Sequence, residues 1–316
     1  MAQFITFPTW IRPEVFPGLP IRWYGLMYVI AFSIAYLLIL IQVKRKETSL
    51  DNEGALNAVL YCVVGLILGA RLFSVLFYDG SWYYWTHPHL IFWPFRGGQF
   101  VGLPGMSYHG GLVGAIVGGW IFSRTNKVDF FELADTVALA SPLGYTFGRL
   151  GNFINGELYG RVSTARWAML FPEATPFSTN YSWVREIADQ VGIAYESGAL
   201  VNLPRHPSQL YEALFEGILL FLFLWFVIRR RRTEKPDGIA LAWYMIGYGT
   251  VRFFIEYFRT PDANLGYIIA WGKGSDNIAL FQSFFNISLG QIFCLGMILA
   301  GTLFALYLHR RHKKES

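Results

Sequence analysis

The chain has 316 residues, of which 54% are hydrophobic and only 15% are charged. Soluble domains carry about 25% charged residues, so this composition argues against an ordinary soluble protein and indicates a membrane bundle. The net charge of +5 does not indicate nucleic-acid binding, because the basic residues cluster between apolar segments, which is typical of membrane topology signals. Cys62 and Cys294 are the only cysteines, and their apolar settings argue against a disulfide framework or a cysteine-based metal site.

Seven apolar segments in chain order predict membrane-spanning helices, the third of them short. They lie near residues 21–43, 55–77, 108–122, 130–150, 207–228, 239–258 and 288–308. The expected fold class is therefore an all-α polytopic membrane protein, a single membrane domain over residues 1–316 with about seven transmembrane helices. The aromatic residues that precede the first segment are expected at the membrane interface, and they are Phe4, Phe7, Trp10 and Phe16.

Basic clusters follow the first, third, fifth and seventh segments, and the four-arginine run Arg229–Arg232 is one of them. Under the positive-inside rule these clusters face the cytoplasm. The N-terminus is then expected outside the membrane and the C-terminus inside. Residues 157–206 are the longest polar connection, too long for a simple loop, and they predict a small periplasmic insertion on the outer side.

The first three segments contain two groups of interest. Trp23-Tyr24-Gly25 opens the first segment, and Tyr24 is expected to contact a lipid or its headgroup. His109 opens the third segment, where a histidine is either a hydrogen-bonding helix cap or a base, and the sequence leaves both readings open. In the same segment Gly110, Gly114 and Gly118 predict close packing against another helix.

The fourth segment ends in a polar, glycine-rich stretch, Gly148–Gly160. Glycines let a ligand approach the backbone, and amides and guanidinium groups hold phosphate oxygens. The alternative is a glycine-rich helix end with polar caps. If the helix continues beyond residue 150, Arg149 shares one face with Tyr145 and Asn152. The polar residues of the stretch are Arg149, Asn152, Asn155 and Glu157, and the candidate glycine is Gly160.

The fifth and sixth segments carry polar stripes. One face of the fifth segment carries Gln209, Glu212 and Glu216. The alternative to a functional role is structural: these residues cap the helix, and its dipole favours a carboxylate at the N-terminus. Along the sixth segment, four polar residues follow one another at spacings of four, four and three on an otherwise apolar helix. They form one stripe, which is expected to face the bundle interior. The plain alternative there is a structural Arg252–Glu256 ion pair. The residues of this stripe are Tyr248, Arg252, Glu256 and Arg259.

Together these motifs resemble the bacterial prolipoprotein diacylglyceryl transferases. The similar stretches are GRLGNFINGELYG at 148–160, HPSQLYE at 206–212, HGG at 109–111 and YGxxRFxxExxRxPD from Tyr248 to Asp262. The resemblance implies that a diacylglyceryl group passes from phosphatidylglycerol to the lipobox cysteine thiol of a prolipoprotein, which forms a thioether and releases glycerol phosphate. It also implies the bacterial cytoplasmic (inner) membrane and the first step of lipoprotein maturation.

The resemblance also suggests residue roles. Arg149 and Arg252 are expected to stabilise charge on the departing phosphate, and His109 is the first candidate base. Glu212 and Glu256 are expected to orient the arginines. No cofactor, metal ion or nucleic-acid partner is expected. The residues expected at the substrate are Tyr24, Gln209, Glu212, Tyr248, Glu256 and Arg259, together with Asn152, Asn155, Glu157 and Gly160.

Two alternatives come from other classes. A polytopic transporter also places charged residues on interior faces, but the two halves of the chain show no repeat that would support it. An intramembrane serine protease would need a serine and a histidine facing each other. Ser107 and His109 are two residues apart and do not meet on a helix, and no GxSxG motif surrounds a membrane serine.

Overall fold

A computed structural model describes residues 4–16, 22–78, 83–100, 102, 105–230, 236–261, 266–271 and 277–315. Ile21 of the first predicted span, Arg231 and Arg232 of the basic run, and Asp262 of the last motif lie outside the described residues. The chain forms two compact units, one from residues up to 35 and from 138 onward, the other from residues 36–137. Both are mostly helical, which confirms the helical part of the predicted fold class.

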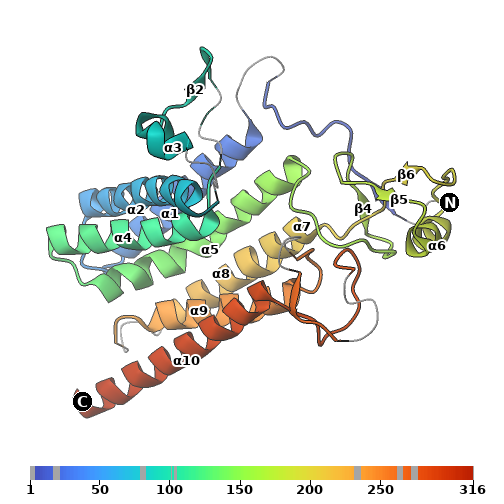
Figure 1. Ribbon diagram of the computed structural model, residues 1–316. Helices are drawn as coiled ribbons and strands as arrows, with labels where there is room; N and C mark the ends of the chain where they lie inside the picture. The colour runs from blue at the N-terminus through green and yellow to red at the C-terminus, as the bar shows by residue number, and fades with distance from the viewer. Residues whose placement is uncertain are drawn as a thin grey trace. The chain divides into compact units, whose positions relative to one another are not determined.

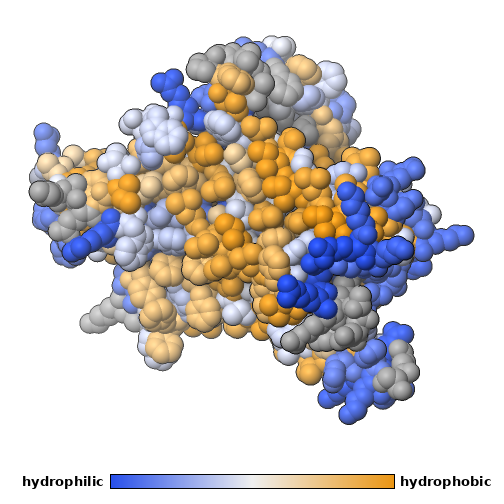
Figure 2. Space-filling model, turned by 180° about the vertical axis from the view of Figure 1, so that it is seen from behind, coloured by the Kyte–Doolittle hydropathy of each residue, from blue (hydrophilic) through white to orange (hydrophobic). Residues whose placement is uncertain are grey.

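Four helical segments among the described residues are long and apolar enough to cross a membrane. They are α1 (Trp23–Lys44), α2 (Asn52–Phe73) with η1 (Ser74–Tyr78), the continuous run Ser208–Ile228, and α10 (Leu289–Glu315). The apolar helix α9 (Ile239–Ile255) is shorter. Figure 2 shows hydrophobic side chains exposed over much of one face of the molecule. Such surfaces are stable in lipid, so the chain is a multi-pass membrane protein.

The unit of residues 36–137 is organised by α2 and α4 (Tyr108–Asn126), which lie side by side (Figure 1). A Cβ atom on Gly65 would meet the carbonyl of Gly114, and one on Gly118 would meet the carbonyl of Tyr61. The predicted small-residue face is thereby confirmed, because only glycine allows this backbone approach. The short elements here are α3 (Tyr83–Thr86), η2 (Pro88–Ile91), β2 (Phe95–Arg96) and β3 (Gln99–Phe100).

Helix α5 (Phe130–Ile154) extends four residues beyond its predicted end. At its start, Asp129 Oδ1 accepts hydrogen bonds from the amides of Phe131 at 2.8 Å and Glu132 at 3.0 Å, so this aspartate caps the helix. It ends in a Schellman motif, in which the Glu157 amide donates to the Asn152 carbonyl and Gly156 has a φ of +66°. Arg149 and Asn152 therefore lie on the same helix.

The fifth predicted span is one continuous helical run, composed of α7 (Ser208–Glu212), η3 (Ala213–Leu219), α8 (Leu220–Phe223) and η4 (Leu224–Ile228). Helices α9 and α10 run side by side (Figure 1), and a Cβ atom on Gly249 would lie 3.0 Å from the Cys294 carbonyl. The predicted end of α9 at residue 258 is wrong, since the helix ends at Ile255. Arg259 instead forms an isolated antiparallel β-bridge with Gly160. Pro261 disfavours the helical conformation at Thr260, the residue before it.

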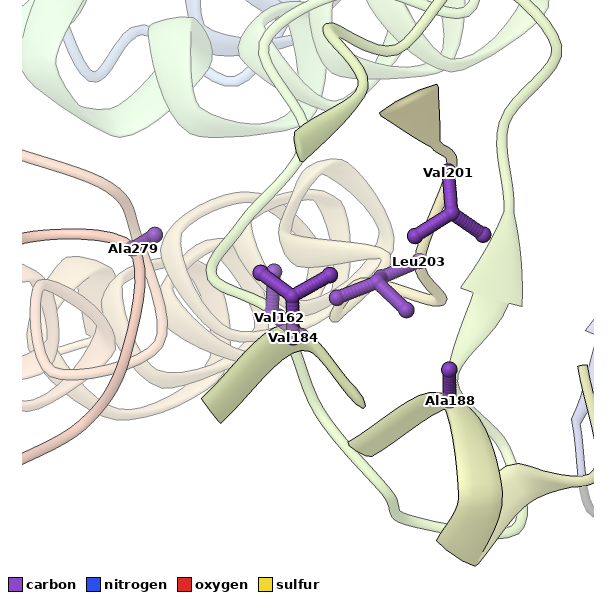
Figure 3. Close-up of a cluster of buried hydrophobic side chains, with 6 residues drawn as sticks. All are labelled: Val162, Val184, Ala188, Val201, Leu203 and Ala279. Atoms are coloured by element: carbon purple, nitrogen blue, oxygen red, sulfur yellow. The ribbon is translucent and has the colours of Figure 1, made fainter. Parts of the chain in front are cut away.

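The polar residues 157–206 fold around a small apolar core (Figure 3). Strand β5 (Phe177–Ser178) pairs antiparallel with β6 (Leu200–Val201), and α6 (Ser182–Val191) packs Val184 and Ala188 into the core. Strand β4 (Met169–Leu170) pairs in parallel with the N-terminal β1 (Ile5–Thr6). The core residues drawn are Val162, Val184, Ala188, Val201, Leu203 and Ala279.

The expectation that Phe7 lies at the membrane interface is wrong. Phe7 is buried in a second cluster with Met169 and Phe171, because the β1–β4 pairing brings the N-terminal segment onto the polar region. Farther along the chain, β7 (Tyr267–Ile269) pairs antiparallel with β8 (Ile287–Ser288). Strand β8 leads directly into α10, so this hairpin determines where α10 begins.

Candidate functional site

Three arginines and three glutamates form a cluster of ion pairs within the unit that contains residues 138–316. We call it the arginine–glutamate cluster, and its members are Arg149 on α5, Glu212 on α7, Glu216 on η3, Arg252 on α9, and Glu256 and Arg259 just after α9. Every member has an oppositely charged partner within 3.6 Å. Buried charges require such pairing, because an unpaired one is strongly destabilising.

Glu212 is the centre of the cluster, with a fully buried side chain. Its Oε2 lies 2.8 Å from Arg149 Nε and 3.2 Å from Arg252 Nη1. Its Oε1 accepts a hydrogen bond of 2.6 Å from Arg259 Nη1. One carboxylate therefore contacts all three guanidinium groups. The expectation that Glu212 orients the arginines has a geometric basis, although the role itself remains a proposal.

Glu216 and Tyr145 complete the buried side of the cluster, and neither was among the predicted site residues. Glu216 Oε1 lies 3.4 Å from Arg252 Nη1, and Tyr145 Oη donates to Glu216 Oε2 at 2.5 Å. Arg149 Nε in turn donates to Tyr145 Oη at 2.6 Å. The available signal for Glu216 was its position four residues after Glu212 within an apolar segment, where a carboxylate is costly unless it has a function or a partner.

Glu256 pairs with two arginines, so the ion pair that the sequence left as an alternative is present. Its Oε2 lies 3.0 Å from Arg252 Nη2 and 3.6 Å from Arg259 Nε. The Arg149, Arg252 and Arg259 side chains keep 14%, 16% and 18% of their surface exposed and that of Glu256 keeps 9%, whereas those of Glu212 and Glu216 keep none. The accessible side of the cluster therefore carries more positive than negative charge, as binding of an anion requires.

The glycine-rich stretch lies against this cluster. Arg149 Nη1 donates to Asn152 Oδ1 at 3.4 Å, and Asn152 Nδ2 donates to Glu157 Oε1 at 3.0 Å. Asn155 Nδ2 reaches the same Glu157 oxygen at 3.3 Å, and Gln209 Nε2 donates to the Glu157 carbonyl at 2.6 Å. Within the described residues, the side-chain amide oxygens Asn155 Oδ1 and Gln209 Oε1 are buried and have no hydrogen-bond partner.

Gly160 lies where the polar region meets the end of α9. A Cβ atom here would overlap the Phe258 carbonyl, and the Gly160 amide donates to the His206 carbonyl at 2.8 Å. His206 Nδ1 lies 3.1 Å from Tyr211 Oη. Burial, assisted by the nearby charge of Arg161, lowers the pKa of His206 to about 4, so this imidazole is neutral at neutral pH.

The remaining predicted residues are less closely tied to the cluster. The Tyr248 ring lies 6.0 Å from the Tyr145 ring at 90°. Tyr24 Oη lies 3.1 Å from Tyr28 Oη, and a Cβ atom on Gly151 would lie 3.5 Å from the Tyr24 ring. His109 opens α4 and belongs to the other compact unit, so its role as a base stays a prediction.

Comparison with known proteins supplies the family. The sequence profile of the prolipoprotein diacylglyceryl transferases matches residues 13–307. The chain belongs to this family. Within the family, it is 49% identical to the phosphatidylglycerol–prolipoprotein diacylglyceryl transferase of Treponema denticola, over 99% of this chain and 97% of that protein. It is 47% identical to the enzyme of the same name from Treponema pallidum, with the same coverage, and 41% identical to that of Borreliella afzelii, over 100% and 98%.

Membership of the prolipoprotein diacylglyceryl transferase family bears on what the cluster can do. The matched range contains all six charged residues of the cluster and the whole glycine-rich stretch. Three guanidinium groups backed by buried carboxylates are suited to hold a phosphate group and to stabilise charge that develops on it. Among the described residues, no group of three metal-ligating side chains gathers anywhere.

Proposed function

We propose that this chain transfers the diacylglyceryl group of phosphatidylglycerol to the cysteine thiol of a prolipoprotein lipobox, the first step of lipoprotein maturation. The observation that carries this proposal is the cationic accessible side of the arginine–glutamate cluster. The thiolate sulfur attacks the glycerol carbon that bears the phosphate ester. A carbon–sulfur bond forms, the carbon–oxygen bond breaks, and glycerol phosphate leaves with the electron pair. The thiol proton goes to a base, for which His109 is the first candidate.

Arg149 and Arg252 act on the leaving phosphate. They come from different helices, α5 and α9, and both contact Oε2 of Glu212. This shared carboxylate holds the two guanidinium groups around one position, so they require little reorganisation as negative charge develops. Planar, two-pronged donors also match the geometry of phosphate oxygens. Glu256 supports the same arrangement from the end of α9, and Arg259 adds a third positive charge.

The headgroup of the donor lies, in this proposal, against the glycine-rich stretch. The buried side-chain amide oxygens of Asn155 and Gln209 have no partner among the described residues, and a glycerol headgroup offers hydroxyl groups that donate hydrogen bonds. Asn152, Glu157 and Gly160 shape the surrounding wall. Tyr24 and Tyr248 contribute aromatic surface for the glycerol backbone and the acyl chains.

The direct test uses purified protein in detergent, phosphatidylglycerol labelled in its acyl chains and a lipobox peptide. The expected result is label on the peptide cysteine without peptide cleavage, and no label on a matched peptide with serine in place of cysteine. Peptide cleavage would indicate a protease. Lipid or solute movement across proteoliposomes without labelling would indicate a transporter, and either outcome would overturn the proposal.

The membrane arrangement is part of the proposal. Helices α4, α5 and α9 join the four long apolar helices to give seven spans in the bacterial cytoplasmic membrane, with residues 157–206 periplasmic, the N-terminus outside and the C-terminus inside. The distribution of basic residues supports this orientation. Single cysteines placed between residues 170 and 200, in a chain without Cys62 and Cys294, are expected to react with an impermeant thiol reagent in cells whose outer membrane has been opened. Protection of these cysteines there would contradict the orientation.

A further inference from the structure

The carboxylate of Glu256 depends on a residue outside the cluster. Its Oε2 faces Arg252 and Arg259 at ion-pair distances but without hydrogen-bond geometry. Its Oε1 accepts a hydrogen bond of 3.2 Å from Ser288 Oγ. Within the described part of the chain, this is the one hydrogen bond to that carboxylate. Because a hydrogen bond is directional, Ser288 fixes the orientation of Oε1, whereas the two arginines attract Oε2.

Ser288 is itself held by a reciprocal capping box at the start of α10. Its Oγ accepts from the Gln291 amide at 3.2 Å, and Gln291 Oε1 accepts from the Ser288 amide at 3.0 Å. Both residues are buried, with exposed fractions of 3% and 1%. Gln291 Nε2 also donates to the Phe253 carbonyl on α9 at 3.3 Å, so the box is anchored to the helix that carries Arg252. The Ser288 hydroxyl thus accepts a hydrogen bond from Gln291 while it donates its own proton to Glu256.

The backbone of α10 completes this contact. A Cβ atom on Gly290 would lie 3.0 Å from Glu256 Oε1 and 3.2 Å from its Cδ, so the first turn of α10 packs directly against the carboxylate. The N-terminus of a helix carries partial positive charge and favours a carboxylate placed there. The start of α10 therefore donates a hydrogen bond to Glu256, packs against its carboxylate and places partial positive charge beside it.

We infer that Ser288 is a positioning residue for diacylglyceryl transfer, acting through Glu256 on the guanidinium groups of Arg252 and Arg259. This inference rests on the proposed function. Removing the hydroxyl frees Glu256 to rotate, and Arg252 and Arg259 are then held less firmly by one of their carboxylate partners. The expected consequence is slower chemistry at an unchanged protein fold, because small displacements of catalytic groups lower the rate strongly.

The key variant is Ser288→Gly. Glycine is tolerated at an N-cap with only a small loss of stability, so this change removes the contact with Glu256 while largely keeping the cap. We expect kcat to fall by about tenfold, less than the roughly 100- to 1,000-fold loss for a direct donor, with KM for phosphatidylglycerol changing by less than about twofold. Ser288→Thr keeps the hydroxyl and should recover most of the rate.

Ser123 offers a matched control. It is also a buried serine near a helix end, where its Oγ donates to the Val128 carbonyl at 2.7 Å, and no described contact links it to the cluster. Ser123→Ala should leave kcat unchanged. Equal losses of kcat in Ser288→Gly and Ser123→Ala would overturn the inference, because both would then report general destabilisation. Thermal unfolding of all variants is measured in parallel.

A double-mutant cycle with Glu256→Ala, which removes the acceptor of the Ser288 hydrogen bond, tests the route of action. If Ser288 acts through Glu256, adding Ser288→Gly to Glu256→Ala should cost less than about twofold, against about tenfold in the wild-type background. If the rate losses of the two substitutions multiply, Ser288 does not act through Glu256. A normal rate in Ser288→Gly alone would also exclude this route. Failure of the proposed function is recognised separately, because the wild-type protein would then transfer no lipid in the same assay.

Discussion

Glu212 Oε2 lies 2.8 Å from Arg149 Nε, a contact between α7 and α5 that links residues 63 positions apart in the chain. Because the same carboxylate also contacts Arg252 and Arg259, the three arginines are not independent side chains. A change at one is expected to alter the positions of the others. Transfer rates of variants in the cluster therefore have to be compared with thermal unfolding of the same variants.

Replacing Arg149 or Arg252 by lysine should preserve membrane insertion and the fold but abolish most of the transfer. Lysine keeps the charge and loses the planar, two-pronged donor. The barrier should rise by about 2.7–4 kcal/mol, the scale of a removed oxyanion donor, when rates are measured on purified, detergent-solubilised variants. Arg259→Lys should lose less. Arg229→Lys is the matched control, since Arg229 is buried against Trp225, outside the cluster. Near-normal transfer by both Arg149→Lys and Arg252→Lys would mean that the site requires positive charge and not the guanidinium geometry.

Glu212→Gln should be the most destabilising single change in the cluster. The amide keeps the shape but removes the one carboxylate shared by three guanidinium groups, which leaves excess buried positive charge. Breaking a buried ion pair from one side costs about 3–5 kcal/mol, so the thermal midpoint of the purified protein should drop by several degrees. An unchanged midpoint would mean that Glu212 is not ionised in the folded protein.

Glu256→Gln should damage transfer less than Arg252→Ala does. The glutamine still accepts the Ser288 hydrogen bond and still faces both arginines, whereas the alanine removes a positive charge from the site. The comparison needs rates from the two purified variants at saturating phosphatidylglycerol. If the glutamine variant were the slower one, Glu256 would have a direct chemical role rather than an orienting one.

His109→Ala should lower transfer by about 100-fold or more if His109 is the base. A free thiol has a pKa of about 8.5, so raising the pH from 7 to 9 supplies thiolate and should partly restore the rate of the variant. The pH dependence of the transfer rate for wild type and variant checks this. A variant rate that equals wild type across the pH range would leave His109, in the first turn of α4, with a structural role only.

The stability of the protein should fall as the pH drops from about 6.5 to about 4, partly through His206. Its folded pKa of about 4 lies below the ordinary value of 6.5, so only the unfolded chain takes up the proton in this window. The stabilising contribution is complete above pH 6.5 and is lost as the pH approaches 4. Thermal unfolding of His206→Gln should depend less on pH than that of wild type. His309→Gln, which changes an exposed histidine, should leave the wild-type slope unchanged.

Much of the fold follows from local patterns in the sequence. Apolar segments of membrane-spanning length predicted the described helices to within a few residues at most ends, because burial in lipid requires long hydrophobic runs. The spacing of Gly110, Gly114 and Gly118 predicted a close helix contact, and the spacing of Arg149 and Asn152 placed them on one face. These predictions succeed because helical periodicity is fixed by the backbone alone.

The composition of the cluster was only partly predictable. Arg149, Arg252 and Glu212 stood out because charge in an apolar segment requires a partner or a function. That one carboxylate serves three arginines, or that Tyr145 and Glu216 close the buried side, depends on how α5, α7, η3 and α9 face each other. The rotation of one helix against another is set by side-chain packing along the whole contact, and no single segment contains that information.

The family resemblance, the helical membrane class and the residues that carry charge into the bundle can all be predicted from residue patterns along the chain. The burial of Phe7 against the polar region, the end of α9 at Ile255 and the contact of Ser288 with Glu256 become visible in the folded protein alone. Each of these depends on a pairing between distant segments: β1 with β4, Gly160 with Arg259, and the start of α10 with the end of α9. Local propensity does not encode such pairings, because their free energy comes from burying surfaces that meet only in the folded chain.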